Sequence, residues 1–192
     1  MENNLVNILK SYIRKGTNLL ELGCGNGQLI KDIVQKHPDL GRVACVDYFN
    51  SPTELPKKVS FFKQDLENFE MDGVYDLVII NHVLEHIKNP IGLLEKIKKN
   101  LSNFGKILIV VPNRKGFLNE ADVYFPEHGK HYFLWDKQSL GFSLNRIGFT
   151  CRFHNLYFAG SNNFLLKYMP AIFRIQNPNL ICVAMVDSDP KI

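Results

Sequence analysis

The stretch that decides the fold is Leu20-Glu21-Leu22-Gly23-Cys24-Gly25-Asn26-Gly27. Its apolar start predicts a short buried strand, and the glycines predict a tight turn that lets a ligand approach the backbone closely. Apolar residues at helical spacing over 27–36 predict that a helix follows, whose first N–H groups can face an anionic ligand group. The spacing is G-x-G-x-G rather than the G-x-G-x-x-G of dinucleotide sites, which favours a smaller nucleoside ligand.

Outward from this loop, strand-like and helix-like segments alternate, which predicts an α/β fold with a mainly parallel sheet covered by helices. The expected strands are residues 18–22, 42–47, 59–64, 75–80, 106–111, 149–158 and 180–186. The expected helices are residues 5–13, 27–36 and 90–101, with a turn at 102–105 and a last helix capped by Asp136 and closed by Gly148.

Composition predicts one soluble domain. The 192 residues suit a single domain over 1–192, with substrate-pocket inserts near 113–135 and 157–178. A net charge of +4 with scattered lysines does not compel nucleic acid as a partner. The four cysteines form no C-x-x-C pair, and neither a signal peptide nor an 18-residue apolar run is present, so we expect a cytoplasmic protein.

Two carboxylates follow expected strands at the same edge of the sheet. Asp47 ends the second strand, where a carboxylate can accept both hydroxyls of a ribose. Asp65 follows the third strand, where it can accept from an adenine amino group while the Leu66 N–H meets a ring nitrogen. In series with the glycine loop, the two acids predict an adenosine site.

The ordered motifs resemble the class I S-adenosylmethionine-dependent methyltransferases, in particular a small-molecule branch often called type 11 or type 12. They are ELGCGNG (21–27), VDYF (46–49), QDLE (64–67), YDLVIINHVLEHIKNP (75–90) and LLEKIKKNLSNFGKILIVVPN (93–113). The resemblance implies a Rossmann-like three-layer sandwich with strand order 3-2-1-4-5-7-6 and strand 7 antiparallel. It also implies S-adenosylmethionine as methyl donor and S-adenosylhomocysteine (SAH) as product.

The same resemblance implies the donor-binding residues. Glu21 and the loop hold the methionyl part, Asp47 takes the ribose, and Tyr48 packs near the adenine. Asp65 and Leu66 read the adenine edge, while Asn81 and His82 lie under the methionyl end. The full expected set is Glu21, Gly23, Cys24, Gly25, Asn26, Gly27, Asp47, Tyr48, Asp65, Leu66, Asn81 and His82.

The histidines allow three interpretations. A helix over residues 82–88 would place His82, Glu85 and His86 on one face, and His128 and His131 follow the fifth strand. One histidine can act as general base, because imidazole titrates near neutral pH. Alternatively, these residues gather a divalent metal, or Glu85 and His86 only brace the sheet.

The metal interpretation resembles the small-RNA terminal 2′-O-methyltransferases, which carry an E-x-x-E-H helix. This chain has His82 where that family has Glu. We therefore predict catalytic histidines (His82, His86, His128 and His131) and no metal.

The favoured function is methyl transfer to oxygen or nitrogen of a small molecule, such as a sugar, a quinol precursor or a lipid-linked intermediate. Aromatic residues crowd 117–135 and can line the acceptor pocket. The alternatives are a metal-assisted RNA 2′-O-methyltransferase and a non-catalytic methyltransferase-like subunit. We expect no membrane span and a monomer or homodimer.

Overall fold

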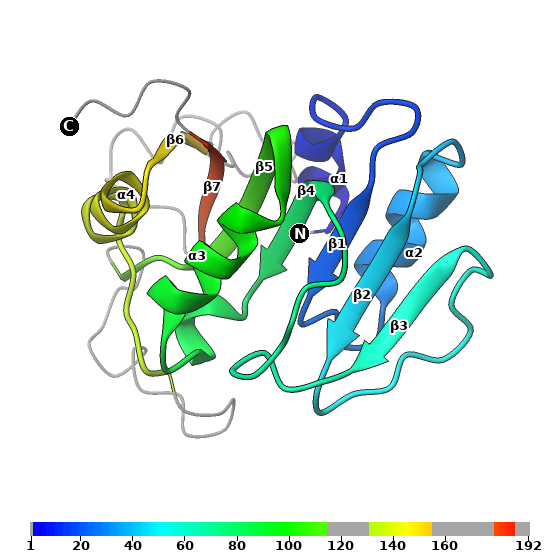
Figure 1. Ribbon diagram of the computed structural model, residues 1–192, viewed down its shortest axis with the longest axis horizontal. Helices are drawn as coiled ribbons and strands as arrows, with labels where there is room; N and C mark the ends of the chain where they lie inside the picture. The colour runs from blue at the N-terminus through cyan, green and yellow to red at the C-terminus, as the bar shows by residue number, and fades with distance from the viewer. Residues whose placement is uncertain (1, 115–130, 155–178, 187–192) are drawn as a thin grey trace, which may run out of the picture.

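A seven-stranded sheet forms the centre of the computed structural model, which describes residues 2–114, 131–154 and 179–186 (Figure 1). Its strands are β1 (Leu19–Leu22), β2 (Val43–Asp47), β3 (Val59–Lys63), β4 (Tyr75–Asn81), β5 (Leu101–Pro112), β6 (Phe149–His154) and β7 (Asn179–Val186). Their order is β3-β2-β1-β4-β5-β7-β6, as expected. The pairs from β3 to β5 are parallel, and β7 runs antiparallel to both of its neighbours, which confirms the predicted α/β sandwich.

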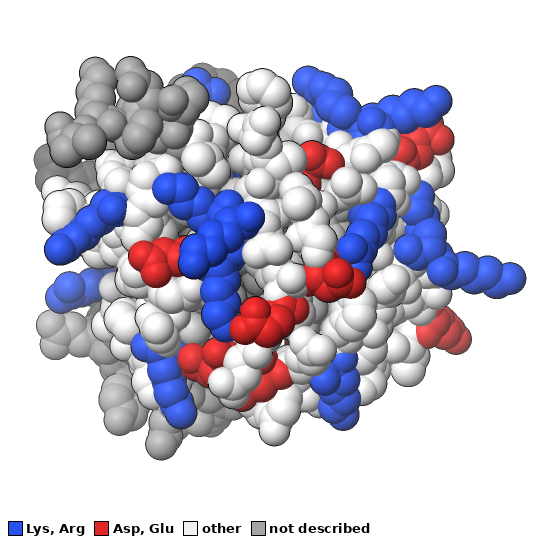
Figure 2. Space-filling view, in the orientation of Figure 1, with Lys and Arg blue, Asp and Glu red and all other residues white. Residues whose placement is uncertain are grey.

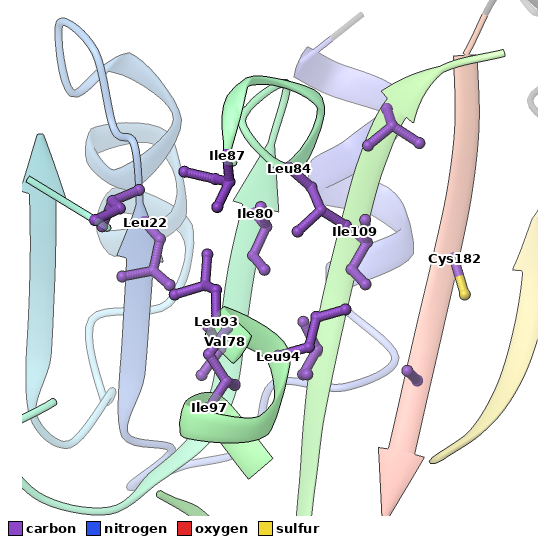
Figure 3. Close-up of a cluster of buried hydrophobic side chains, with 14 of the residues drawn as sticks. Leu22, Val78, Ile80, Leu84, Ile87, Leu93, Leu94, Ile97, Ile109 and Cys182 are labelled. Atoms are coloured by element: carbon purple, nitrogen blue, oxygen red, sulfur yellow. The ribbon is translucent and has the colours of Figure 1, made fainter. Parts of the chain in front are cut away.

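Helices cover both faces of the sheet and make three layers. They are α1 (Glu2–Leu9), α2 (Gln28–Lys36), α3 (Pro90–Lys99) and α4 (Lys137–Arg146), with one 3₁₀ turn, η1 (Leu84–His86). One buried cluster joins α1 and α2 to one face, and a second joins α3 and α4 to the other. Figure 3 shows the second cluster, where leucines of α3 meet isoleucines of β4 and β5.

The strands supply both clusters because successive side chains point to opposite faces. In β4, Ile79 belongs to the α1–α2 cluster and Ile80 to the α3–α4 cluster, and both are fully buried. Burying one such side chain contributes about 1.5–3 kcal/mol. A central parallel strand therefore needs the continuous apolar run that the sequence shows.

Signals at α2 and α4 mark the helix ends as predicted, whereas α1 and α3 end at Leu9 and Lys99, before the expected residues 13 and 101. His37, before Pro38, caps the end of α2. Asp136 caps α4 because its side chain accepts the Ser139 N–H at 2.9 Å. In return, the Ser139 hydroxyl oxygen accepts the Asp136 N–H, which completes a capping box. Gly148 follows α4 with φ +81°, a conformation that favours glycine.

The predicted turn at residues 102–105 is wrong as a strand boundary. These residues form a bulge inside β5: Leu101 pairs with Tyr75, and the next pair is Lys106 with Leu77. Opposite the bulge, the Ser102 hydroxyl donates to Asp76 Oδ1 at 2.6 Å. Backbone pairing resumes on the same neighbour after residue 105, so the strand continues through the expected turn.

The expected helix over residues 82–88 is also wrong, because only η1 forms there. His82 has φ +53°, a left-handed conformation that a helix does not allow. The sixth strand is described as far as His154, and its expected extension to residue 158 lies outside the described residues. The insert at 157–178 and most of the insert at 113–135 also lie outside them.

Charged side chains of both signs are interspersed on the face shown in Figure 2. Among the described residues, no helix combines the length and apolar character needed to cross a membrane.

Candidate functional site

Three glycines shape the loop after β1. Gly23, Gly25 and Gly27 all have positive φ, at +71°, +54° and +77°. A Cβ at Gly23 would overlap the Val83 side chain, whereas a Cβ at Gly25 would enter open space. The loop therefore packs closely against the segment after β4 at its first glycine and leaves room at its second.

Asp47 links this loop to the end of β2. Its carboxylate is 6% exposed and accepts the Gly25 N–H on Oδ2 at 2.8 Å. Oδ1 accepts the Asn50 N–H at 2.7 Å and the Asn50 side-chain amide at 3.3 Å. A carboxylate offers about four acceptor positions, so Oδ2 keeps one for a ligand hydroxyl.

The loops after β3 and β4 form the opposite wall. Asp65 accepts the Glu67 N–H at 3.0 Å, and Glu67 Oε1 accepts the Lys88 N–H at 2.6 Å. The second bond ties the two loops together across 21 residues of sequence. On the side of β2, Tyr48 and Phe49 meet edge to face with ring centroids 5.0 Å apart.

These walls enclose a pocket of about 640 Å³ at the carboxyl ends of β1 to β4. This volume lies within the range of about 300–1,000 Å³ typical of cofactor sites, and the position is where open α/β sheets bind ligands. Its lining is Gly23, Gly25, Asp47, Tyr48, Phe49, Asn50, Asp65, Leu66, Glu67, His82, Val83, His86, Ile87, Lys88 and Tyr132.

Most of the expected donor-binding residues meet in this pocket. Seven of them line it: Gly23, Gly25, Asp47, Tyr48, Asp65, Leu66 and His82. Of the described residues, Glu21, Cys24, Asn26, Gly27 and Asn81 are not in the lining. Glu21 is instead buried within β1 and does not line the pocket.

Several lining residues were not among the expected set. Phe49 is the most informative, because its side chain is 87% exposed at the pocket edge beside Tyr48. The signal was present in the aromatic pair of the VDYF motif, where only the first ring was assigned. Val83, Ile87 and Lys88 carry no signal of their own, since they reach the pocket only through the fold of η1 and its flanks.

Cys24 is a buried thiol within the glycine loop. A hydrogen bond with Cys45 and burial both raise the pKa of the Cys24 thiol far above its usual range. The thiol therefore stays protonated and acts as a small packing group rather than a nucleophile.

A family model described as a methyltransferase domain matches residues 3–152. The chain belongs to the methyltransferase domain family. This membership confirms the resemblance to class I S-adenosylmethionine-dependent methyltransferases, and the match extends from α1 into β6.

Curated relatives of this methyltransferase act at both oxygen and nitrogen. The chain is 28% identical over 111 residues to a malonyl-[acyl-carrier protein] O-methyltransferase of Acetivibrio thermocellus, covering 55% of this chain and 39% of the relative. It is 31% identical over 110 residues to (S)-coclaurine N-methyltransferase of Thalictrum flavum, covering 52% and 30%. The chain thus spans well under half the length of these two relatives.

Solved structures agree on the fold. The plantazolicin methyltransferase BpumL, in complex with a substrate analogue and SAH, superposes with a TM-score of 0.69 at 20% identity, covering 97% of this chain and 82% of that one. At this identity the likeness establishes the methyltransferase fold alone.

The pocket fits the donor that the family uses. Asp47 presents an acceptor position beside the glycine loop, as a ribose requires, and Tyr48 and Phe49 offer an aromatic edge for an adenine. The room left at Gly25 lets a ligand approach the backbone there. The comparisons support S-adenosylmethionine as the cofactor of this methyltransferase.

The histidines gather at one end of the pocket of this methyltransferase. His82 and His86 line it, and the His86 ring meets His131 edge to face at 4.6 Å between centroids. His82 Nδ1 lies 3.5 Å from Oε1 of Glu85, whose side chain is 1% exposed. His128 lies outside the described residues. Of the two histidines expected after β5, His131 thus lies beside His86, although no helix aligns the residues after β4.

Proposed function

We propose that this protein transfers a methyl group from S-adenosylmethionine to an oxygen or nitrogen atom of a small-molecule acceptor. The observation that supports this most directly is the Asp47 carboxylate, held beside the glycine loop with an acceptor position toward the pocket. The relatives' names support both oxygen and nitrogen as acceptor atoms. Sugars, quinol precursors and lipid-linked intermediates are the acceptor classes that we expect.

In this proposal, different pocket residues contact different parts of the methyl donor. Asp47 accepts a ribose hydroxyl, and Asp65 with Leu66 meets the adenine edge between the two tied loops. Tyr48 and Phe49 cover the adenine from the side of β2. The first turn of α2 and the loop lie at the methionyl end, toward His82.

The donor, when bound, supplies a methyl group on a positively charged sulfur. The task of the protein is then to hold the acceptor atom behind that methyl group and to remove its proton. His82 and His86 line the pocket on the side of η1, and His131 supports His86 from the other segment. We assign the removal of the acceptor's proton to this group of histidines, because an imidazole can accept a proton near neutral pH.

Calorimetric titration with SAH tests donor binding. We expect binding to the parent protein and a loss of about 10- to 100-fold in Asp47→Asn, because hydrogen bonds to a charged group contribute about 1.5–3 kcal/mol. The matched control is Asp39→Asn, an exposed aspartate outside the pocket lining, which should bind like the parent. Equal affinity in Asp47→Asn and the parent would contradict the proposal.

Turnover to SAH with a panel of small acceptors tests the reaction. We expect His131→Ala to slow turnover while SAH affinity stays within about twofold of the parent. Donor binding with no turnover on any acceptor class would favour a non-catalytic subunit. Turnover on an RNA 3′ end alone would favour the RNA-modifying alternative.

A further inference from the structure

The buried carboxylate of Glu85 has no hydrogen-bond donor in the described part of the chain. Its side chain is 1% exposed, and an ionised carboxylate is costly to bury without a partner or a metal ion. His82 Nδ1 lies 3.5 Å from Oε1, well beyond the charge-assisted hydrogen-bond distance of about 2.7–2.9 Å. The ion pair with His82 therefore compensates this charge only weakly.

Two other imidazoles complete the surroundings of this carboxylate. His86 follows Glu85 in η1, and His131 comes from the segment before α4. One ligand atom from each of Glu85, His86 and His131 lies within 4.8 Å of the other two. The two imidazoles are inclined at 66° with ring centroids 4.6 Å apart, so they are close neighbours without stacking face to face.

Backbone hydrogen bonds hold the two segments in this arrangement. The Glu85 carbonyl accepts the Tyr132 N–H at 2.8 Å and the Phe133 N–H at 3.3 Å, and the His86 N–H donates to the Val83 carbonyl at 2.9 Å. The position of His131 beside η1 is thus set by the main chain rather than by a side chain alone.

We propose that Glu85, His86 and His131 bind one divalent transition-metal ion at the rim of the pocket. Imidazole and carboxylate together suit Zn²⁺, Mn²⁺ and Fe²⁺. Tetrahedral bonds of about 2.1 Å place ligand atoms about 3.4 Å apart, so small side-chain rotations close the cluster around an ion. The absence of a carboxylate at position 82 is no obstacle to this site, because it does not use that position.

Three protein ligands leave at least one coordination position for another molecule. His86 and Tyr132 line the pocket, so the cluster borders the space where an acceptor would lie. An ion here would polarise an acceptor oxygen, and His86 and His131 would act as ligands, leaving His82 as the base. This consequence rests on the proposed function, whereas ion binding itself does not.

Titration of the purified chain with ZnCl₂ and, separately, MnCl₂ after chelator treatment tests the site without any methyl donor. We expect one equivalent of at least one ion to bind the parent protein, with at least tenfold weaker binding in Glu85→Gln and in His131→Ala. His37→Ala and His154→Ala are matched controls, because these histidines lie at the end of α2 and in β6, and both should bind the ion like the parent.

A thermal-unfolding series covers the case in which Glu85→Gln fails to fold. Saturating ion should raise the Tm of the parent and leave that of His131→Ala unchanged, because a ligand stabilises only the state that binds it. SAH titration of the same variant monitors the donor pocket, so loss of the ion site is distinguished from loss of the proposed function. Absence of stoichiometric binding to the parent, or equal affinity in the parent and His131→Ala, would overturn the inference.

Discussion

At the scale of single residues, Asp47 both stabilises the fold and offers a hydrogen-bond acceptor to the proposed ligand. It stabilises the loop after β1 through Gly25 and the turn after β2 through Asn50, with three of its acceptor positions used. An alanine at this position would lose the loop as well as the ligand contact. Asparagine is the better test, since it keeps the volume and one acceptor oxygen.

Among the described residues, Cys151 is the cysteine whose thiol pKa is lowered. It is partly exposed on β6, and a hydrogen bond from Cys182 lowers its pKa from 9.0 to about 7. We predict that its alkylation by iodoacetamide has a pH midpoint near 7, because the thiolate is the nucleophile. Peptide mass spectrometry over pH 5.5–9.5 measures this midpoint.

The matched variant for this prediction is Cys182→Ala, which removes the donor and should move the midpoint upward. Cys24 is an internal control, because its raised pKa should leave it unmodified in the folded protein. A parent midpoint close to 9 would show that the Cys182 hydrogen bond does not stabilise the thiolate.

At the scale of elements, Gly23 and Gly25, two of the three glycines in the loop after β1, have different constraints. Both have positive φ, where an L-residue costs about 1–2 kcal/mol, but only Gly23 faces an occupied position, the Val83 side chain. We predict that Gly23→Ala lowers the free energy of unfolding by clearly more than Gly25→Ala. Urea unfolding of the two variants and the parent checks this order.

SAH binding should separate the same two variants. Gly25→Ala adds its methyl group to open space that lines the pocket, so it should weaken SAH binding more than it weakens the fold. A Gly25→Ala protein that is as destabilised as Gly23→Ala would mean that the loop is strained throughout.

The segments after β4 and within β5 show where element prediction failed. Spacing alone predicted a helix at residues 82–88, but the His82 N–H donates to the Val110 carbonyl of β5 at 2.9 Å. This bond extends the sheet past the end of β4 and holds His82 in a left-handed conformation. In the same way, pairing with β4 on both sides of residues 102–105 makes these residues a bulge within β5 rather than the expected turn between two elements. Neither partner is local in sequence.

At the scale of the whole molecule, two histidines make stability depend on pH. Burial lowers the pKa of His37 and of His154, with nearby Lys10 and Lys36 adding to the effect at His37 and Arg152 at His154. Their folded pKa values thus lie below the unfolded value of 6.5, so the unfolded chain binds more protons in this range. We predict that these two histidines make the free energy of unfolding fall as the pH drops below 6.5, and that they contribute no pH dependence well above that value.

Urea unfolding at pH 7.5, 6.5 and 5.5 measures this dependence. The double variant His37→Asn/His154→Asn should show a weaker fall between pH 6.5 and 5.5 than the parent. A parent that gains stability as the pH falls through this interval would contradict the sign of both pKa shifts.

From local periodicity and capping residues, the sequence by itself predicted the strands and the cap at Asp136. The motifs that stay in chain order gave the family, and the strand order came with that resemblance. The sequence also identified the acids of the pocket, since parallel strands bring their carboxyl ends to one edge. Only the tertiary structure decided that Glu21 is buried rather than in the pocket lining, that Phe49 lines the pocket beside Tyr48, and that His131 meets Glu85 and His86. The physical reason for the histidine contact is that the N–H groups of Tyr132 and Phe133 bond to the distant Glu85 carbonyl, a pairing that no local pattern records.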